Sequence, residues 1–370
     1  MSDWTATTVG ALTHNHDSQR RPVKSSDRAA GIYPYYGASG IIDNVDGFTH
    51  DGEYLLIAED GENLRSRSTP IGFMTRGRVW VNNHAHVVSG NDQGDTRFLN
   101  YLIAVTDVTG YITGSAQPKL SKMSLESIRV RVPDLPTQQA VAEVLGALDD
   151  KIAANQRLVA TSDQLSALRF EALVASGSEV RPLSSLAQFV NGMAFTKGAT
   201  GSGRVVLRIA ELNSGIGNST VYNDIDVDDR HLARPGDLLF AWSGSLTVHR
   251  WFRPEAIVNQ HIFKVLPMTA PLWVVNGALR RKLADFKGIA ADKATTMGHI
   301  QRHHLDQEVL VPTSLNISAN DNAMTALWNR ALQAERESLH LAHVRDTLLP
   351  LLMSGRLLVK DAEHVAAQVI

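Results

Sequence analysis

The sequence contains no cysteine among its 370 residues. This absence excludes disulfides, thiolate metal sites and cysteine nucleophiles together, and it fits the reducing environment of a cytoplasm. No apolar run reaches the roughly 18 residues that a membrane span needs, so no transmembrane helix is expected. Residues 1–10 lack a basic stretch followed by an apolar one, the pattern of a secretory signal. These absences predict a cytoplasmic protein.

The sequence also lacks an excess of positive charge. It has 36 Lys and Arg residues against 38 Asp and Glu, which gives a formal net charge of −2. Because the neutralisation of DNA phosphates requires Lys and Arg, this balance on its face argues against nucleic-acid binding. A DNA-binding protein of this composition would need local basic patches, or a partner that shares the phosphates. Net charge alone therefore leaves the question open.

Catalytic signatures are missing as well. The sequence has no phosphate-binding Gly-x-x-x-x-Gly-Lys-Ser/Thr loop, no Asn-Pro-Pro-aromatic or Asp-Pro-Pro-aromatic segment, no helix-opening Gly-x-Gly-x-x-Gly and no Gly-x-Ser-x-Gly elbow. These separate absences agree with one another. They predict a chain that has no catalytic site and binds no metal or cofactor of its own.

What the sequence does contain is an internal repeat with a period of about 180 residues. Several segments recur in the same order, and in both copies a strand-like run ends in a proline and is followed by a long helical pattern. The order of parts predicts two tandem globular units, each followed by a helix. The matched segments are residues 55–61 with 238–244, 81–84 with 258–261, 118–125 with 298–305, and 128–133 with 308–312.

Within each unit the pattern is mixed α/β. Residues 54–58 and 237–241 are short apolar runs after glycine, typical of strands, whereas residues 98–105 and 272–286 read as helices. We therefore predict an α+β protein in five parts. These are a first domain at 1–134, a helix at 135–177, a second domain at 178–313, a second helix at 314–356 and a tail at 357–370.

Both long helices carry an apolar stripe that alternates spacings of four and three residues, the pattern of a coiled coil. We predict that the helices pack on each other in antiparallel fashion, because a whole globular unit separates them in the chain. If fully helical, residues 137–174 would span roughly 57 Å at about 1.5 Å per residue and serve as a spacer. The alternative is that each helix caps only its own domain. The stripes are Val141, Leu145, Leu148, Ile152, Asn155 and Val159, and Leu327, Ala331, Ala334, Ser338, Leu341, Leu348 and Leu352.

Taken together, these features resemble the specificity subunit of a type I restriction-modification system over about residues 4–355. Four segments carry the resemblance: the opening GIYPYYGASGIID at 31–43, the late loop AQPKLS at 116–121, the helix opening LPTQQ at 135–139 with LDDKI at 148–152, and LSSL at 183–186 with Gly192. Residues 315–327 lack a counterpart of LPTQQ, so the sequence leaves the start of the second helix open.

The resemblance implies a division of labour. Two target-recognition domains in tandem would each read one half of a bipartite, asymmetric target in double-stranded DNA. The helix pair would set the gap between the halves and dock two methyltransferase subunits, which would bind S-adenosylmethionine. Motor-nuclease subunits are a further expected partner of the complex.

We predict DNA contacts at three groups of polar or basic residues. Two arginines after a glycine loop suit guanine recognition, a duplicated late loop suits phosphate contacts, and a basic helix stretch could follow the backbone. For each residue the alternative is an ordinary solvated side chain. The residues are Arg65 and Arg67; Lys119, Ser121, Lys122, Gln301 and Arg302; and Arg280 and Arg281.

Two further features receive structural interpretations. His84 and His86 would share one face of a strand and could bind a metal, but the repeat has Phe263 in place of His86, which favours hydrogen-bonded structural histidines at His84 and His261. The acidic run at 59–62 has no carboxylate in its repeat counterpart, so a catalytic metal role is disfavoured. Tyr33, Tyr35 and Tyr36 are predicted to be core strand residues.

Two competing functions stay open at this point. The chain could be a coiled-coil scaffold whose globular units bind protein and never DNA, or an enzyme whose site is unrecognised. Salt-dependent binding to a specific duplex would separate DNA recognition from the scaffold, because a scaffold would show none.

Overall fold

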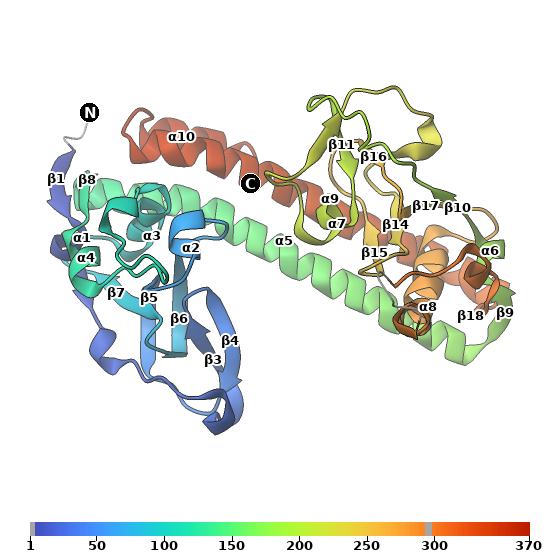
Figure 1. The fold of residues 1–370 in the computed structure, drawn as a ribbon, viewed down its shortest axis with the longest axis horizontal. Coiled ribbons are helices and arrows are strands. Elements are labelled where there is room, and N and C mark those ends of the chain that lie inside the picture. The colour runs from blue at the N-terminus through green and yellow to red at the C-terminus, as the bar shows by residue number, and fades with distance from the viewer. Residues whose placement is uncertain (1–3, 293–297) are drawn as a thin grey trace. The chain divides into compact units, whose positions relative to one another are not determined.

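The computed structural model describes residues 4–292 and 298–370 (Figure 1). The chain divides into two compact units. The first unit combines Met1–Lys151 with Leu341–Ile370, and the second unit is Ile152–His340. In the described part of the chain, no helix is both long and apolar enough to span a membrane.

The first unit is organised around one six-stranded sheet. Its strand order is β2-β7-β5-β6-β3-β4, and neighbours are antiparallel except β3 and β6, which run parallel. Of the three tyrosines predicted for the core, Tyr35 on β3 is buried, whereas Tyr33 and Tyr36 are half-buried, and Tyr36 stacks on Phe73 of β6. The strands are β2 (Thr13–Asn15), β7 (Ala85–Gly90), β5 (His50–Ala58), β6 (Gly72–Val81), β3 (Ala30–Gly37) and β4 (Gly40–Val45).

Helix α3 (Thr96–Val105) covers β5, β6 and β7 of this sheet. Asp95 caps it by accepting a hydrogen bond from the backbone N–H of Phe98, and Phe98 and Ile103 are fully buried against the sheet. The helix predicted for residues 98–105 is thus confirmed. The remaining short elements are β1 (Thr5–Thr8) paired with β8 (Arg129–Val132), and α1 (Val9–Leu12), α2 (Asn63–Ser66) and α4 (Lys122–Ser127).

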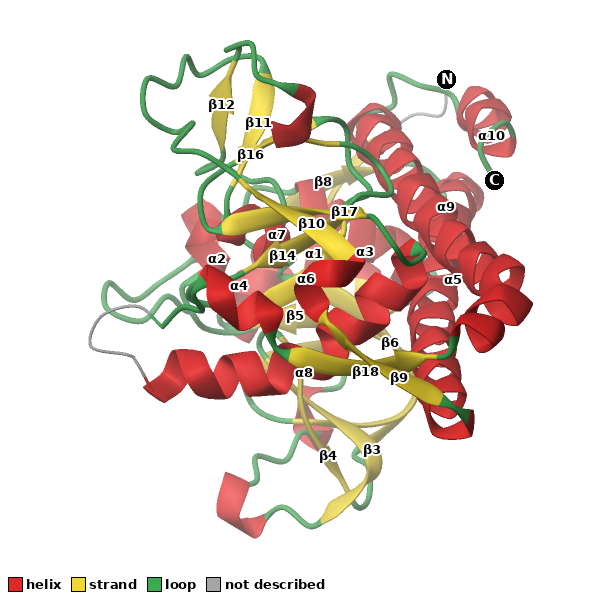
Figure 2. Cartoon of the chain, turned by 90° about the vertical axis from the view of Figure 1, so that its right-hand side faces the viewer, coloured by secondary structure: helices red, strands yellow, loops and turns green. Residues whose placement is uncertain are grey.

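The second unit contains two four-stranded sheets and one two-stranded sheet, and a helix covers part of them. Helix α8 (Leu272–Asp292), longer than predicted, packs against β15, β17 and β18, and Figure 2 shows it beside β18. The sheets have the orders β10-β17-β14-β15, β12-β11-β16-β13 and β18-β9. The strands are β9 (Ser178–Pro182), β10 (Ala187–Asn191), β11 (Arg204–Leu207), β12 (Val221–Asn223), β13 (Leu232–Ala233), β14 (Leu238–Ala241), β15 (Thr247–Arg250), β16 (Ala256–Val258), β17 (Ile262–Pro267) and β18 (Glu308–Pro312), with short helices α6 (Leu183–Leu186) and α7 (Ile209–Ser214).

The repeat seen in the sequence is visible as matching backbone hydrogen bonds. Leu120 N donates to Glu59 O at 2.8 Å in the first unit, and Ile300 N donates to Trp242 O at 3.1 Å in the second. The late loop of each unit therefore docks on the end of the equivalent strand. The other matched donors and acceptors are Gly61 N to Pro118 O with Gly244 N to Gly298 O, Glu59 N to His84 O with Trp242 N to His261 O, and Asn82 N to Tyr36 O with Asn259 N to Leu207 O.

One strand distinguishes the two copies. In the first unit β6 is long enough to pair with both β5 and β3, whereas in the second unit its place is taken by β15 and β16. The break at residues 251–255 contains Pro254, which has no N–H to give to a sheet. Two four-stranded sheets of the second unit therefore stand in place of the single six-stranded sheet of the first.

The long helices are α5 (Leu135–Ser176) and α9 (Ser314–Met353). In the second unit Asn155 donates to Glu337 at 2.9 Å, and Arg169 donates to Asn320 at 2.8 Å. Residue numbers rise along α5 as they fall along α9, so the helices run antiparallel and pack on each other, as predicted. Asn155 is 5% exposed and forms the polar seam position that the sequence indicated.

The structure shows where the second long helix begins, which the sequence left open. The helix begins at Ser314, whose N–H donates to Oε1 of Glu179, and Thr313 Oγ1 accepts from the N–H of Asn316. In the segment predicted as a tail, Val359–Ala367 forms helix α10, with Ala362 and Ala366 buried.

Candidate nucleic-acid interface

The first unit brings four predicted contact residues onto two adjoining loops. Lys119 forms isolated bridges with Asp60 and with Thr113, so the loop after β5 is tied to the loop before α4. Arg65 follows the first loop and donates to Gly114 O at 2.6 Å on the second. The assembly thus gathers Arg65, Lys119, Ser121 and Lys122 at one end of the sheet.

The charges of these residues are partly compensated. Lys119 Nζ lies 3.1 Å from Oε1 of Glu59 but its side chain is 53% exposed, and Lys122 lies 3.8 Å from Glu126 with 54% exposed. Such surface pairs are weak and exchange readily with another anion. Ser121 caps α4 by accepting from Ser124 N, so its hydroxyl has a structural role.

Arg67 lies apart from this group. Its backbone is left-handed, with φ of 46°, and its guanidinium donates to Ala104 O at 2.9 Å and Thr106 O at 2.7 Å. It therefore caps the carboxyl end of α3, where carbonyl groups lack partners and a cation is favoured. This role could not be predicted from the sequence, because it depends on a contact between residues almost forty positions apart.

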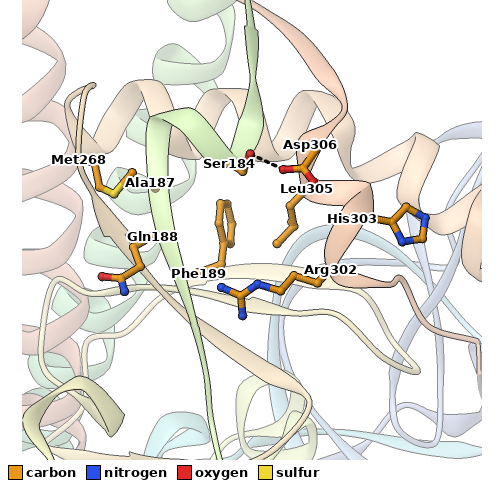
Figure 3. Close-up of a pocket in the computed structure, with 9 residues that line it drawn as sticks. All are labelled: Ser184, Ala187, Gln188, Phe189, Met268, Arg302, His303, Leu305 and Asp306. Carbon is orange, nitrogen blue, oxygen red and sulfur yellow. Dashed lines mark hydrogen bonds between the residues drawn. The ribbon is translucent and has the colours of Figure 1, made fainter.

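In the second unit the late loop borders a surface groove of about 490 Å³ (Figure 3). Phe189 and Leu305 form part of its lining, the Arg302 guanidinium extends toward Phe189, and His303 points away. Among the described residues no carboxylate pairs with Arg302, so its charge is available to a ligand. Gln301 N donates to His304 Nδ1 at 3.0 Å and starts the turn that presents Arg302.

Arg280 and Arg281 lie elsewhere on the second unit. Arg280 donates to Asn276 at 3.0 Å and to Val248 O at 3.3 Å, and Arg281 pairs with Glu171 of α5. The cleft that they line includes residues of α5 and α9 and shares no lining residue with the Arg302 groove. The structure thus separates these two arginines from the late loop, and their contact with DNA stays a prediction.

A buried ionic cluster contacts the loops of the first unit through His86 and Glu59. His86 is 1% exposed, and its two ring nitrogens face Asp17 at 2.6 Å and Leu120 O at 2.8 Å. Glu59 pairs with Arg20 at 2.6 Å. Burial would raise the pKa of Asp17, but the hydrogen bond and charge of His86, and then a backbone N–H and Arg20, outweigh it and leave the pKa lowered.

Three of these side chains have ligand atoms within 4.8 Å of one another and could in principle surround a metal ion: Asp17, Glu59 and His86. The chemistry of the cluster opposes that use, because Arg20 and Lys119 already neutralise the carboxylates. His84 lies in the turn before β7 and bonds a different carboxylate, Asp60, at 2.7 Å. The two histidines therefore do not form a metal pair.

The prediction for His261 was wrong in one respect. His84 has its hydrogen bond to Asp60, but among the described residues no atom bonds the buried Nδ1 of His261. The repeat gives the reason: Ser243 stands where the first unit has Asp60, so this position offers the ring no carboxylate. The His261 ring packs instead against Trp242, with centroids 5.2 Å apart.

The sequence-based choice of contacts missed two exposed cations, Arg21 and Lys24, in the loop before β3. This loop is tied to the sheet, since Trp80 Nε1 donates to Arg21 O at 2.7 Å and Val23 N donates to Tyr35 Oη at 3.0 Å. In the described part of the chain neither cation has a carboxylate partner. The cluster of basic residues at Arg20, Arg21 and Lys24 was the available signal.

A separate surface lies on α5 within the second unit. It is a stripe of apolar and small side chains, spaced alternately by four and three residues, and all its members except Leu158 are exposed. Leu165 is 47% exposed and Leu168 is 63% exposed. An apolar helical stripe of this kind is suited to a partner helix. Its members are Ala154, Leu158, Thr161, Leu165, Leu168, Ala172 and Ala175.

Comparison with known proteins finds one family and related proteins. Residues 1–161 match the family model of the type I restriction modification DNA specificity domain. A Haemophilus influenzae protein named as a type I restriction enzyme specificity subunit is 40% identical over 133 residues, 36% of this chain and 34% of that protein. The EcoprrI specificity subunit of Escherichia coli is 29% identical over 118 residues, 32% of this chain and 28% of that one. The chain thus matches about a third of the length of these relatives.

The likeness in fold extends along the whole chain. The crystal structure of a type I restriction-modification S subunit from M. genitalium superposes with a TM-score of 0.66 and covers 95% of this chain and 96% of that one. Sequence identity is 14%, so this comparison speaks for the fold alone. Residues 1–161 therefore resemble the type I restriction modification DNA specificity domain, and the chain shares the fold of the M. genitalium S subunit over 95% of its length.

Proposed function

We propose that this chain is the DNA-recognition subunit of a type I restriction-modification complex and has no catalytic role of its own. Each unit reads one half of a bipartite, asymmetric target in double-stranded DNA. The observation that carries this proposal is the repeat of one loop scaffold with different side chains on it. Glu59 and Lys119 of the first unit correspond to Trp242 and His299 of the second.

The difference in chemistry at the two loop assemblies supports an asymmetric target. The first assembly is ionic, with Lys119 paired to Glu59. The second is aromatic, with Trp242 5.2 Å from His261 and 6.2 Å from His299, measured between ring centroids. Base edges are distinguished by donors, acceptors and apolar contacts, so two such different surfaces would select different bases.

The antiparallel helices supply the spacer of the proposed complex, and the α5 stripe supplies the docking surface for its methyltransferase subunits. Exposed leucines at 165 and 168 support a helical partner at this place. Two methyltransferase subunits would hold the S-adenosylmethionine and perform the transfer. Motor-nuclease subunits would join through them, and the assembly would act in the cytoplasm, where its DNA lies.

Binding to DNA at increasing salt tests this function directly. The purified chain, with a methyltransferase subunit from the same source cell, is mixed with a random duplex library, and bound duplexes are sequenced at two salt concentrations. We expect enrichment of one gapped, asymmetric motif and a binding constant that falls as salt rises. Arg302→Ala should lower the salt slope by about one, whereas Arg330→Ala, on the exposed side of α9, should leave it unchanged.

The alternative is the protein-binding scaffold. No enrichment of any duplex, combined with intact methyltransferase binding, would establish that alternative and refute DNA recognition.

A further inference from the structure

Each unit contains a polar cluster where its globular part meets the two long helices. In the second unit the cluster is built on Arg250 of β15, whose side chain is 4% exposed. Its Nη1 donates to Oδ1 of Asp163 on α5 at 3.0 Å, and its Nε donates to Oε2 of Glu335 on α9 at 2.7 Å. One guanidinium thus holds one strand and both helices at once.

The geometry of this cluster is directional. Nη2 of Arg250 makes second bonds to Asp163 at 3.3 Å and to Glu335 at 3.0 Å, so both carboxylates are held by two bonds. The guanidinium carbon lies 4.8 Å from the ring centroid of Trp328, also on α9. A planar fork that binds two carboxylates and stacks on a ring fixes angles as well as distances.

The first unit has a cluster of different composition in the same kind of place. Tyr101 of α3 donates from its hydroxyl to Oδ2 of Asp149 on α5 at 2.6 Å. Arg345 of α9 donates to Oδ1 of the same carboxylate at 2.7 Å. Again one side chain of the globular part, one acid of α5 and one charged group of α9 meet.

The electrostatics agree with this geometry. Burial would lower the pKa of Arg250, but its hydrogen bonds to Glu335 and Asp163 outweigh burial and raise it. Burial also raises the pKa of Tyr101, and the adjacent Asp149 carboxylate raises it further. Both groups therefore stay protonated and keep donating their hydrogen bonds at neutral pH.

The surrounding apolar contacts stabilise the interface but do not by themselves fix its direction. Phe170, Trp273 and Met324 join the second unit's core to its helices, and their burial stabilises the contact. The hydrophobic effect is proportional to buried area and has no preferred direction. The bidentate pairs add a directional restraint that the burial of apolar area does not supply.

We propose that Arg250 and Tyr101 are positioning residues that fix the angle of each globular domain on the helix pair. They thereby set which distance between half-sites the protein accepts. This second part rests on the function proposed above.

The first test measures a distance that depends on the angle between domain and helices, and it needs no DNA. The chain has no native cysteine, so spin labels at Gln164→Cys on α5 and Gln260→Cys in the globular part report one distance without background labelling. In the full chain we expect a narrow distance distribution. Arg250→Lys keeps the charge but loses the fork, and should lose the single narrow peak; Arg204→Lys, whose partner Glu255 lies within the domain, should keep it.

An unchanged narrow peak in Arg250→Lys would overturn the proposal, as would a broad distribution in the unsubstituted protein. Glu335→Gln serves as a second variant should Arg250→Lys fail to fold. It removes one charge of the cluster, and it is expected to broaden the distance distribution in the same way.

The second test concerns spacing. Plasmids that carry the two half-sites at a series of gap lengths are exposed to the complete methylating complex. Tyr101→Phe removes one hydroxyl and should gain methylation at neighbouring gap lengths, whereas Tyr111→Phe, whose hydroxyl accepts from Arg129 N within the domain, should not. An unchanged set of accepted gaps in both Tyr101→Phe and Arg250→Lys contradicts the proposal. If the unsubstituted complex methylates nothing, the proposed function fails instead, and the spin-label result alone judges the positioning role.

Discussion

Arg67 donates from its guanidinium to two carbonyl groups at the end of α3, on Ala104 and Thr106. Hydrogen bonds that involve a charged group contribute roughly 1.5–3 kcal/mol each, less where water competes. Arg67→Gly accepts the left-handed backbone without strain and removes only the cap. We expect it to lower the free energy of unfolding by about 1–2 kcal/mol.

Chemical denaturation measures this loss, with Arg21→Ala as the control, since Arg21 is exposed and has no carboxylate partner in the described residues. If Arg67→Gly weakened DNA binding and left stability unchanged, Arg67 would be a contact residue after all. The sequence could not distinguish these two roles, because Arg65 and Arg67 both follow the same glycine loop.

Asp17 governs the pH dependence expected of the first unit. Its pKa is lowered from the ordinary 3.8 in the folded protein, so its contribution is present above that value and is lost as the pH falls through the folded pKa. Glu59 has a lowered pKa as well, since Arg20 and His86 outweigh its burial. We expect unfolding free energy to drop as the pH falls below about 4.

Asp17→Asn should flatten this dependence on pH while lowering stability near neutrality, because the buried partner His86 loses its carboxylate. Denaturant titrations of both proteins from pH 6 down to the acid range provide the comparison. Parallel curves would mean that other carboxylates control the acid transition.

At the scale of elements, α8 and α5 cross at a glycine. A Cβ on Gly277 would lie 2.4 Å from Cδ2 of Phe170, which is 2% exposed and packed in the second unit's core. Overpacking of this kind costs about 1–3 kcal/mol, more than the roughly 1 kcal/mol that alanine adds to a helix. Gly277→Ala should therefore be destabilising.

Gly288 of the same helix supplies the matched control, since nothing lies within 4 Å of its missing Cβ. Gly288→Ala should raise the melting temperature where Gly277→Ala lowers it. Equal effects of the two substitutions would show that the α8–α5 contact relaxes easily.

The α5 stripe is the element that we expect to meet the methyltransferase. Leu165 and Leu168 are exposed in the chain, so Leu165→Glu with Leu168→Glu should leave folding intact and sharply reduce co-purification of the methyltransferase subunit. Gln156→Glu and Gln164→Glu add the same charge beside the stripe and act as controls. Undiminished co-purification would place the docking surface elsewhere.

Regular elements were the most predictable part of the fold. The 3–4 spacing of Val141, Leu145 and Leu148 indicated the seam of α5, and all three are buried. The repeat indicated equivalent strands in the two units. Helix α10 and the division of β6 into β15 and β16 were not indicated, because α10 is short and the break at Pro254 interrupts only one of the two copies.

At the scale of the whole molecule, a net charge of −2 coexists with cations that have no acidic partner among the described residues. Arg302, Arg21 and Lys24 are exposed, whereas many acidic side chains, Glu59 and Glu335 among them, are engaged in ion pairs. The sum of charges was therefore a poor guide to the surface. The five-part division of the chain and the set of DNA contacts remain predictions from the sequence.

The central claim is that each unit reads its own half of one target. The most direct measurement is a long-read methylome of the source cell without the gene, with the gene, and with Arg65→Ala or Arg302→Ala. We predict one asymmetric, gapped methylated motif that depends on the gene. Arg65→Ala should relax the bases accepted in one half of this motif, whereas Arg302→Ala, which removes a phosphate contact, should lower methylation without changing the motif. A methylome that does not change when the gene is removed would contradict this prediction, as would relaxed selectivity in both halves with Arg65→Ala.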